Sequence, residues 1–287
     1  MLADVFLVAI GVLGTCIATY SDLKTREVPD WVSYGMIISG FGIRLIQALA
    51  TAQWKYVLFG ALGFAITLII GYGMYVLRQW GGGDAKLLMG LGVLFGTRPF
   101  FVDGSLPFLA VIFVNVLVCG AIYGILVGAW LAMKKGKEFA KRFKEINREK
   151  KWVGAKIAAI GCAGVAFLII FVMSPGMATA STIYWMLVII LLYPYIIIGT
   201  KVVEEVCMMK QVSVANLQEG DWVEQDVMKD GKKVYEKKRL GIEKNDIAKL
   251  MRMKVKTVLV KEGIPFVPPF LVGVIISVVS GKIMFLV

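Results

Sequence analysis

Long apolar runs separated by short polar loops make up most of this chain of 287 residues. An α-helix needs roughly 20 apolar residues to cross a bilayer, and most of the runs approach that length. Lipid offers the backbone no hydrogen-bond partners outside its own helix, so the runs predict helices, and they lack the strand-like alternation of a membrane barrel. Eight membrane-embedded segments are predicted, at about 3–20, 31–50, 56–77, 85–96, 106–133, 152–173, 182–200 and 266–286.

Residues 201–262 break this pattern, because they are polar and rich in both acidic and basic side chains. Short runs of β-branched and aromatic residues predict strands there, with Lys229-Asp230-Gly231 as a hairpin turn. Asn245 is the expected cap of a short helix at 246–253. The predicted strands are 212–214, 222–228, 232–237 and 255–260. This small cytoplasmic α+β module holds no nucleophile–base set and no phosphate-binding loop, which favours a docking or structural role.

The predicted fold class is therefore a polytopic α-helical membrane protein with six to eight transmembrane helices and a small cytoplasmic α+β module. The fourth run is short for a full crossing, so it is expected to be tilted or to continue beyond Gly96. The predicted domains are a transmembrane core at 1–200, which contains a basic cytoplasmic loop at 134–151, the module at 201–262, and a C-terminal transmembrane helix at 263–287.

The distribution of basic residues predicts the orientation in the cytoplasmic membrane. Lys24 and Arg26 follow the first run and no Lys or Arg precedes it, so we expect the N-terminus outside and no cleavable signal peptide. The predicted outer loops carry few charges: the loop before the third run has only Lys55, another has Arg98 and Asp103, and the loop at 174–181 has none. Most of the other basic residues then lie on the cytoplasmic side, as the positive-inside rule requires.

The loop at 134–151 has nine Lys or Arg against three Glu. Phe139, Phe143 and Ile146 recur in it at helical spacing. The segment is predicted either as a helix lying on the inner leaflet or as a solvated loop. In both cases its charge indicates anionic membrane lipid as a partner.

Composition excludes several classes of protein. With 58% apolar residues and a mean hydropathy of +0.76, the chain is not an ordinary soluble protein. The net charge of +12 lacks the aromatic–basic interleaving of a nucleic-acid surface, so no nucleic-acid partner is expected. There is no His and no Cys-x-x-Cys pair, so neither a zinc site nor a cofactor is predicted. The four cysteines are expected to act as small buried apolar residues.

Two acids stand out: Asp22 ends the first run, and Asp84 follows the glycines Gly81–Gly83. Counting crossings places both at the inner ends of their helices. An acid in a membrane segment is costly unless it has a partner or a task. A lone Asp after a glycine turn is more often a helix cap, but two carboxyls at one face suit aspartyl hydrolysis, in which one holds a proton while the other activates water.

The segments around these acids resemble a known family. Asp22-Leu-Lys-Thr-Arg-Glu-Val-Pro-Asp-Trp and Gly81-Gly-Gly-Asp-Ala-Lys-Leu look like the two active-site segments of the type IV prepilin peptidases and archaeal preflagellin (prearchaellin) peptidases, the GxGD aspartyl membrane proteases. The stretch from Ile264 to Gly273 resembles the proline-containing segment that opens their last helix. The resemblance covers the first four runs and the end of the chain.

The resemblance implies an aspartic endopeptidase that removes the short basic leader from type IV pilin or archaellin precursors at the cytoplasmic face. Asp22 and Asp84 become the catalytic pair, and Gly81 and Gly83 become motif glycines that let the substrate backbone pass close to the acid. Bacterial members carry a cysteine-bearing loop between their first two spans and also N-methylate the product. Here that loop has no cysteine, so no methyltransferase activity is expected. Compact archaeal members have six spans, so one or two of the eight runs are expected to be merged or re-entrant.

Glu27 and Asp30 are the candidate contacts for a basic leader, because the basic segment at 134–151 would repel one. Two other functions compete with a peptidase. One is a transporter or channel that uses Asp22 and Asp84 in an ion pathway, and the other is an assembly protein that binds substrate without cutting it. Both acids lie at one face rather than at the membrane centre, and no inverted repeat is visible, which disfavours transport.

Overall fold

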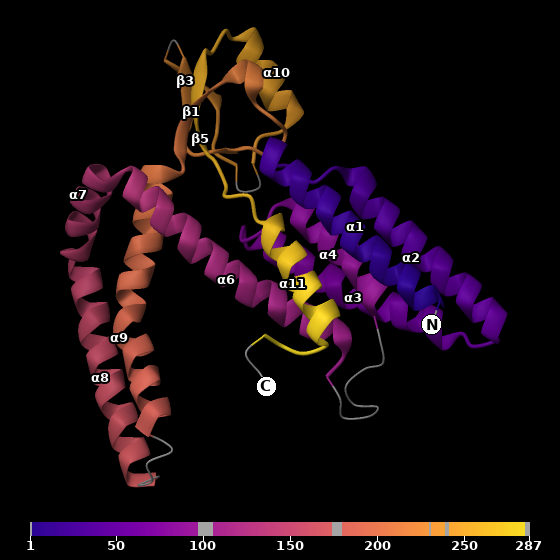
Figure 1. Cartoon of the computed structure of the whole chain (residues 1–287). Coiled ribbons are helices and arrows are strands. Elements are labelled where there is room, and N and C mark those ends of the chain that lie inside the picture. The colour runs from indigo at the N-terminus through magenta and orange to yellow at the C-terminus, as the bar shows by residue number, and fades with distance from the viewer. Residues whose placement is uncertain (1, 97–105, 174–179, 230, 239–240, 285–287) are drawn as a thin grey trace. The chain divides into compact units, whose positions relative to one another are not determined.

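The computed structural model describes residues 2–96, 106–173, 180–229, 231–238 and 241–284, and it is mainly helical (Figure 1). Its apolar helices are α1 (Leu2–Thr25), α2 (Asp30–Thr51), α3 (Lys55–Val76), α4 (Gly82–Phe95), α6 (Phe108–Lys134), α8 (Lys150–Met173), α9 (Ala180–Val202) and α11 (Val267–Ser280). Each predicted apolar run overlaps one of these helices, and the ends differ by a few residues. The predicted outer loops around Arg98 and Asp103 and at 174–181, and the predicted end of the last run at 286, lie wholly or largely outside the described residues.

Six helices within the described ranges are long and apolar enough to cross a membrane. The other two, α4 and α11, have 14 residues each. At 1.5 Å per residue such a helix is roughly 21 Å long, which is shorter than the hydrocarbon core of a bilayer. The prediction of a polytopic α-helical membrane protein with six to eight spans is confirmed.

The described chain divides into two compact units, residues 1–126 with 263–287, and residues 127–262. Helix α6 begins in the first unit and ends in the second. The first unit also contains α1 to α4 and, from the far end of the sequence, α11. The second unit contains α7 (Gly136–Asn147), α8, α9 and the polar module.

Helix α4 forms much of the core of the first unit and packs against α1, α2 and α3 (Figure 1). Nine of its 14 residues are buried. A helix that is apolar on every face belongs either in a protein core or in lipid, and the burial of α4 places it in the core. The run predicted at 85–96 is therefore a short core helix that ends at Phe95, and it does not continue as a helix through Gly96, whose ψ of 123° is extended.

Helices α3 and α4 approach each other through glycines. A Cβ atom on Gly63 would lie 2.1 Å from the carbonyl oxygen of Gly92, so no larger residue fits without moving a backbone. Thr67 lies one turn further along α3, and its hydroxyl donates to the Gly63 carbonyl of the same helix at 2.8 Å. Small residues at such positions let membrane helices pack closely.

We expect Gly63→Ala to lower the free energy of unfolding by about 1–3 kcal/mol, because the α3 backbone must move away from α4. Gly73→Ala on the same helix is the matched control, since nothing lies within 4 Å of its added Cβ. Alanine favours a helix over glycine by about 1 kcal/mol, so the control should be unchanged or more stable. Thermal unfolding of both variants in detergent measures the difference, and equal melting temperatures would contradict the close approach.

The C-terminal end of α4 is closed by a buried arginine from α2. The guanidinium of Arg44 donates to the carbonyl oxygens of Val93 at 2.6 Å, Leu94 at 2.9 Å and Gly96 at 2.7 Å. The last carbonyls of a helix have no partner within the helix, and a cation is favourable beside them. Arg44 therefore lets α4 end inside an apolar unit.

The C-terminal end of α11 is closed in a similar way by a side chain from α6. The Asn115 amide is fully buried and donates to the Ser277 hydroxyl at 2.8 Å and to the Lys282 carbonyl at 3.0 Å. Its oxygen accepts from the Met284 N–H at 2.6 Å. Both short helices of the first unit thus end against a polar side chain from a longer neighbour.

In the second unit, α7 is an amphipathic helix whose apolar face is covered by protein. This face joins α8 and α9 in a small core formed by Phe139, Phe143, Ile146, Trp152, Ile198 and Val202. The helical interpretation of 134–151 is confirmed, and the solvated-loop alternative is wrong. The predicted contact of its apolar face with the inner leaflet is not what the structure has, because that face packs on α8 and α9.

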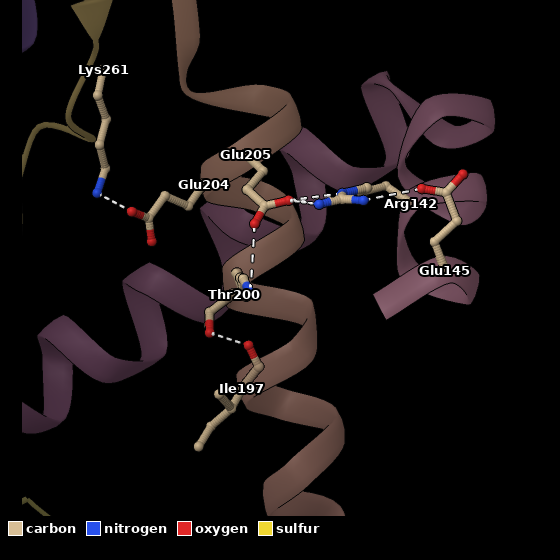
Figure 2. Close-up of polar contacts among 8 residues, drawn as sticks. Arg142, Glu145, Ile197, Thr200, Glu204, Glu205 and Lys261 are labelled. Atoms are coloured by element: carbon tan, nitrogen blue, oxygen red, sulfur yellow. Dashed lines mark hydrogen bonds and ion pairs between the residues drawn. The ribbon is translucent and has the colours of Figure 1, made fainter. Parts of the chain in front are cut away.

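Helix α9 continues into a π-helix, Val203–Cys207, whose two acids, Glu204 and Glu205, form ion pairs with different elements (Figure 2). Glu205 accepts from Arg142 of α7 at 2.7 Å, and Arg142 also contacts Glu145 at 3.1 Å. Glu204 pairs with Lys261 of the sheet. Short π-helices alter the register of successive side chains, and here adjacent glutamates point to α7 and to the sheet.

The polar module is α+β, as predicted. Three strands form an antiparallel sheet in the order β1-β5-β2, and β3 and β4 form a separate hairpin. The elements are β1 (Met209–Ser213), a 3-10 turn (Val214–Asn216), β2 (Trp222–Val223), β3 (Val227–Lys229), β4 (Lys232–Tyr235), α10 (Lys244–Arg252) and β5 (Thr257–Lys261). Their apolar side chains form a core of their own.

Details of the module differ from the prediction. The strand expected at 222–228 is two strands, β2 and β3. Just before β3, the Asp226 carboxylate forms an ion pair with Lys233 at 2.7 Å and accepts from the Lys237 N–H at 2.8 Å. The cap of α10 is Glu243 and not Asn245, since helical geometry already begins at residue 244. The hairpin between β3 and β4 is confirmed, although residue 230 in its turn lies outside the described residues.

Candidate functional site

The two predicted acids lie in the first unit, each at the end of a helix. Asp22 is in the last turn of α1 and only 5% exposed. Asp84 is in the first turn of α4. The charge of Asp22 acts directly on Asp84, so residues 62 positions apart in the sequence share one electrostatic environment. The structure brings together the two carboxyls that the sequence singled out.

Asp22 is held by the start of α11. Its Oδ2 accepts from the Val267 N–H at 2.9 Å, and this bond is buried. The first N–H groups of a helix have no partner within the helix, and they attract negative charge. Two of the four positions in this turn are Pro268 and Pro269, which have no N–H to offer. The Val267 N–H is therefore one of few donors there, and Asp22 takes it.

Asp84 is held by the start of its own helix. Its Oδ2 accepts from the Gly81 N–H at 3.0 Å, which is the bond that a helix-capping acid makes three residues into a helix. Asp84 therefore caps α4, which is the role that the sequence offered as the alternative to catalysis. Both roles are compatible, because capping fixes the carboxyl beside Asp22 without burying it in an ion pair.

An aromatic cluster joins the two acid-bearing segments. Trp80 directly precedes Gly81 and is 3% exposed. Its ring lies 6.0 Å from that of Phe266, which precedes Val267, and 5.4 Å from that of Phe270. Rings at such distances and angles are worth about 0.5–1.5 kcal/mol per pair beyond the area they bury. The cluster fixes the start of α4 against the start of α11, and sequence reasoning missed it because each aromatic taken alone resembles any membrane side chain.

The glycines before Asp84 have different surroundings. A Cβ on Gly83 would lie 2.9 Å from the Val28 Cβ, so this glycine permits close packing against the loop after α1. A Cβ on Gly81 would meet only Asp84 Oδ2, at an ordinary 3.4 Å. Gly83 is thus required by packing within the protein, whereas the space at Gly81 is open beside the carboxyl.

The two loop acids also differ. Asp30, at the first position of α2, forms an ion pair with Lys86 of α4 at 2.6 Å. The Lys86 ammonium also lies 5.6 Å from the centre of the Tyr34 ring. Glu27 is exposed, and its backbone carbonyl accepts from the Ser21 hydroxyl at 2.9 Å. The structure therefore gives Asp30 a partner two residues from Asp84 and leaves the Glu27 carboxylate at the surface.

Cysteines and metal ligands contribute nothing to this site. Across the part of the chain that the structure describes, no three His, Cys, Asp or Glu side chains gather in a way that would hold a metal ion. Cys119 and Cys207 are buried, as expected of small apolar residues, but Cys16 and Cys162 are exposed on α1 and α8. A surface cysteine on a membrane helix faces lipid, where an apolar thiol is as favourable as in a protein core.

Comparison with known proteins covers the segment that holds both acids. Residues 9–125 match the model of the type IV leader peptidase family. The preflagellin peptidase of Methanococcus voltae is 39% identical over 98 residues, which is 34% of this chain and 42% of the relative. That of Methanocaldococcus jannaschii is 38% identical over 85 residues, 30% of this chain and 36% of the relative. The chain thus matches less than half the length of these relatives, and no solved structure matches it.

Proposed function

We propose that this chain, whose residues 9–125 belong to the type IV leader peptidase family, is a membrane endopeptidase that removes leader peptides from archaellin or type IV pilin precursors. The observation that carries the proposal is the pairing of Asp22 with Asp84, each held by a backbone N–H at the start of a helix. The similarity to proteins named preflagellin peptidases favours archaellin precursors over pilins.

In the proposed reaction, Asp22 and Asp84 share one proton, because two neighbouring carboxyls do not both ionise easily. The ionised member takes a proton from water as the water oxygen attacks the peptide carbonyl carbon. The neutral member gives its proton to the carbonyl oxygen. When the C–N bond breaks, the leaving amine takes a proton from the carboxyl that received one from water, and one hydroxyl of the tetrahedral intermediate returns its proton to the other carboxyl, which leaves a carboxylic acid product and restores the shared proton. Water and the two acids account for every atom, so no cofactor is part of the proposal.

The chain is a multi-pass membrane protein, and we place its active site at the cytoplasmic face with the N-terminus outside. The reason is that Arg26 and Arg78 lie in the loops after α1 and α3, and that the largest group of Lys and Arg, at 134–151, joins α6 to α8. The loop between α1 and α2 is short and has no cysteine, so the proposal does not include methylation of the product.

A cleavage assay tests the proposed function directly. The purified chain, in detergent and then in liposomes, is mixed with a peptide that has a basic leader followed by an apolar helix. Mass spectrometry should find one cut between the two parts, at the same rate with and without a chelator. Intact peptide bound to the protein would indicate an assembly protein instead. Intact peptide, together with an ion flux that depends on Asp22 or Asp84, would indicate a channel or transporter.

We further propose that the basic leader contacts the loop between α1 and α2. Glu27 is exposed there, and Asp30 lies beside it, although Lys86 already neutralises Asp30 in part. A basic residue of the leader can replace Lys86 at Asp30, since an exposed ion pair contributes only about 0.2–1 kcal/mol. Glu27 should therefore contribute more to leader recognition than Asp30 does.

The expected result is that Glu27→Gln combined with Asp30→Asn raises KM for a leader with several Lys by roughly two- to fivefold, in line with the weakness of exposed ion pairs. The effect should vanish at high salt, because salt screens exposed charges. Asp30→Asn should act more strongly in a Lys86→Met background, where no internal cation competes. KM values for basic and neutral leaders, measured at two salt concentrations, decide the matter, and an unchanged preference for basic leaders would rule this contact out.

The module at 201–262 is proposed to position a substrate or partner and not to catalyse. Several of its acids are paired with lysines, as Asp226 is with Lys233 and Glu224 with Lys237, and Asp221 accepts from the Gln218 N–H. The hydrogen bond from Lys233 holds the pKa of the Asp226 carboxyl below its usual range, so this acid stays ionised and does not serve as a proton donor. The exposed face of α7, with Lys137, Lys141 and Lys144, is proposed to contact anionic lipid.

A further inference from the structure

An open groove lies between α6 and α11 in the first unit, with a volume of about 200 Å³. Its lining is almost wholly apolar. The lining residues are Cys119, Ile122, Tyr123 and Leu126 from α6, and Pro268, Pro269, Val272 and Met284 from α11 and the segment after it. Ligand pockets for whole small molecules are usually larger, about 300–1,000 Å³, so this groove has room for side chains of a docked segment.

The groove begins beside the candidate catalytic pair. Pro268 directly follows Val267, the residue whose N–H binds Asp22. Tyr123, on the opposite wall, lies close enough to Asp22 for an electrostatic interaction between the two side chains. From this end the lining continues along α11 to Val272 and Met284 and holds no acidic or basic side chain. A chain that reaches the two acids can therefore place its neighbouring residues in the groove.

The groove is also accessible from the side of the unit. Ile122, Leu126 and Val272 are 40%, 63% and 48% exposed, although they line it. In a membrane such surfaces face lipid, so an apolar helix can enter sideways without passing through water. A segment with charged residues would lose hydration in the groove and find no counter-charge there.

We propose that this groove binds the apolar residues that follow the cleaved bond of the substrate, an inference that rests on the proposed peptidase function. The leader, being basic, is excluded by the lack of any acid along the groove and remains on the side of Glu27. The groove thus determines on which side of the bond the apolar segment must lie. It selects precursors by the apolar character of the first residues of the mature protein.

Filling the groove tests the proposal. Val272→Trp and Ile122→Trp place a large side chain in it, whereas Ile275→Trp and Ile125→Trp are controls at exposed positions of the same helices that do not line it. Two peptides share one leader and one cleavage site, and the residues after the site are apolar in one and polar in the other. The wild type should prefer the apolar peptide in kcat/KM, and Val272→Trp should reduce this preference about tenfold or more, the usual effect of losing an apolar pocket.

The controls should keep the wild-type preference. Cleavage of the apolar peptide by Val272→Trp and Ile122→Trp at the wild-type rate would overturn the groove while leaving the peptidase function in place, and would mean that lipid chains alone fill it. A wild type with no preference between the peptides would overturn it as well.

A second measurement does not depend on cleavage. Val272→Cys or Ile275→Cys is introduced into an Asp84→Asn chain whose four native cysteines are replaced by alanine. Peptides then carry one cysteine either before or after the cleavage site. A disulfide cross-link to Val272→Cys only from the residues after the site supports the groove, even if no cleavage is found and the proposed function fails. Cross-linking from both sides alike, or none at Val272→Cys, would overturn it.

Discussion

Asp22→Asn and Asp84→Asn should each reduce cleavage of a precursor peptide at least about a hundredfold. Asn has the shape of Asp but neither donates nor accepts the proton that the reaction moves, and general acid–base steps contribute about 10²–10⁴-fold. The double variant should be no slower than the single ones, because the two carboxyls act as a unit and their effects do not add. Initial rates at saturating and at low peptide concentration give kcat and kcat/KM for each variant.

These variants are expected to remain folded. An Asn oxygen still accepts from the Val267 N–H at position 22 and from the Gly81 N–H at position 84. Asp4→Asn, at the opposite end of α1, is the control for loss of an acid from the same helix and should stay within a few-fold of the wild type. Wild-type rates in either active-site variant, with an unchanged melting temperature, would remove that residue from the catalytic pair.

Arg44→Met should cause the largest loss of stability among the substitutions considered. It leaves the carbonyls of Val93, Leu94 and Gly96 buried without the donors that now satisfy them. Each unsatisfied buried group costs about 1–3 kcal/mol, so a total of ~3 kcal/mol or more is expected. The stability of Arg44→Lys should lie between that of the wild type and that of Arg44→Met, because one ammonium cannot donate to all the carbonyls that the forked guanidinium reaches.

Thermal unfolding in detergent, followed by tryptophan fluorescence, measures this effect. The control is Ser39→Ala on the same helix, whose hydroxyl bonds to α2 itself, mainly to the Gly35 carbonyl at 2.6 Å, and which should change stability by less than about 0.5 kcal/mol. Cleavage by Arg44→Met should also fall, since α4 carries Asp84 at its other end. A melting temperature equal to that of the control would show that water or another group satisfies the carbonyls of α4.

Local sequence was sufficient to locate the helices. Lipid offers no hydrogen-bond partners, so an apolar run must form its backbone hydrogen bonds within its own helix. The eight runs could therefore be assigned without knowledge of their neighbours. It was less reliable in the module, where the run predicted as one strand at 222–228 forms β2 and β3, with the polar residues Glu224-Gln225-Asp226 between them. The Glu224 N–H still donates to the Leu259 carbonyl of β5, whereas Asp226 binds Lys233 of β4, so the two halves of the run associate with different strands.

Sequence also singled out the two acids that the structure brings together, since each stands at one end of an apolar run, and the segments around them have relatives. It did not predict what holds them. Asp22 is bound by an N–H that lies 245 positions away, and the cluster around Trp80 joins residues almost as distant. Every residue except proline has a backbone donor, so the sequence shows that Pro268 and Pro269 cannot bind Asp22 but not that the Val267 N–H does.

What the sequence by itself determined is thus the membrane class, the places of the helices and the two acids. What only the tertiary structure decided is the length and role of α4 and α11. The last carbonyls of a helix have no partners within the helix, so a helix that ends inside an apolar unit needs partners from other elements. Arg44 of α2 supplies those partners for α4, whereas Gly281 ends α11 in a left-handed conformation and Asn115 of α6 binds the residues that follow. Each helix therefore stops after 14 residues, with its other end at Asp84 or beside Asp22.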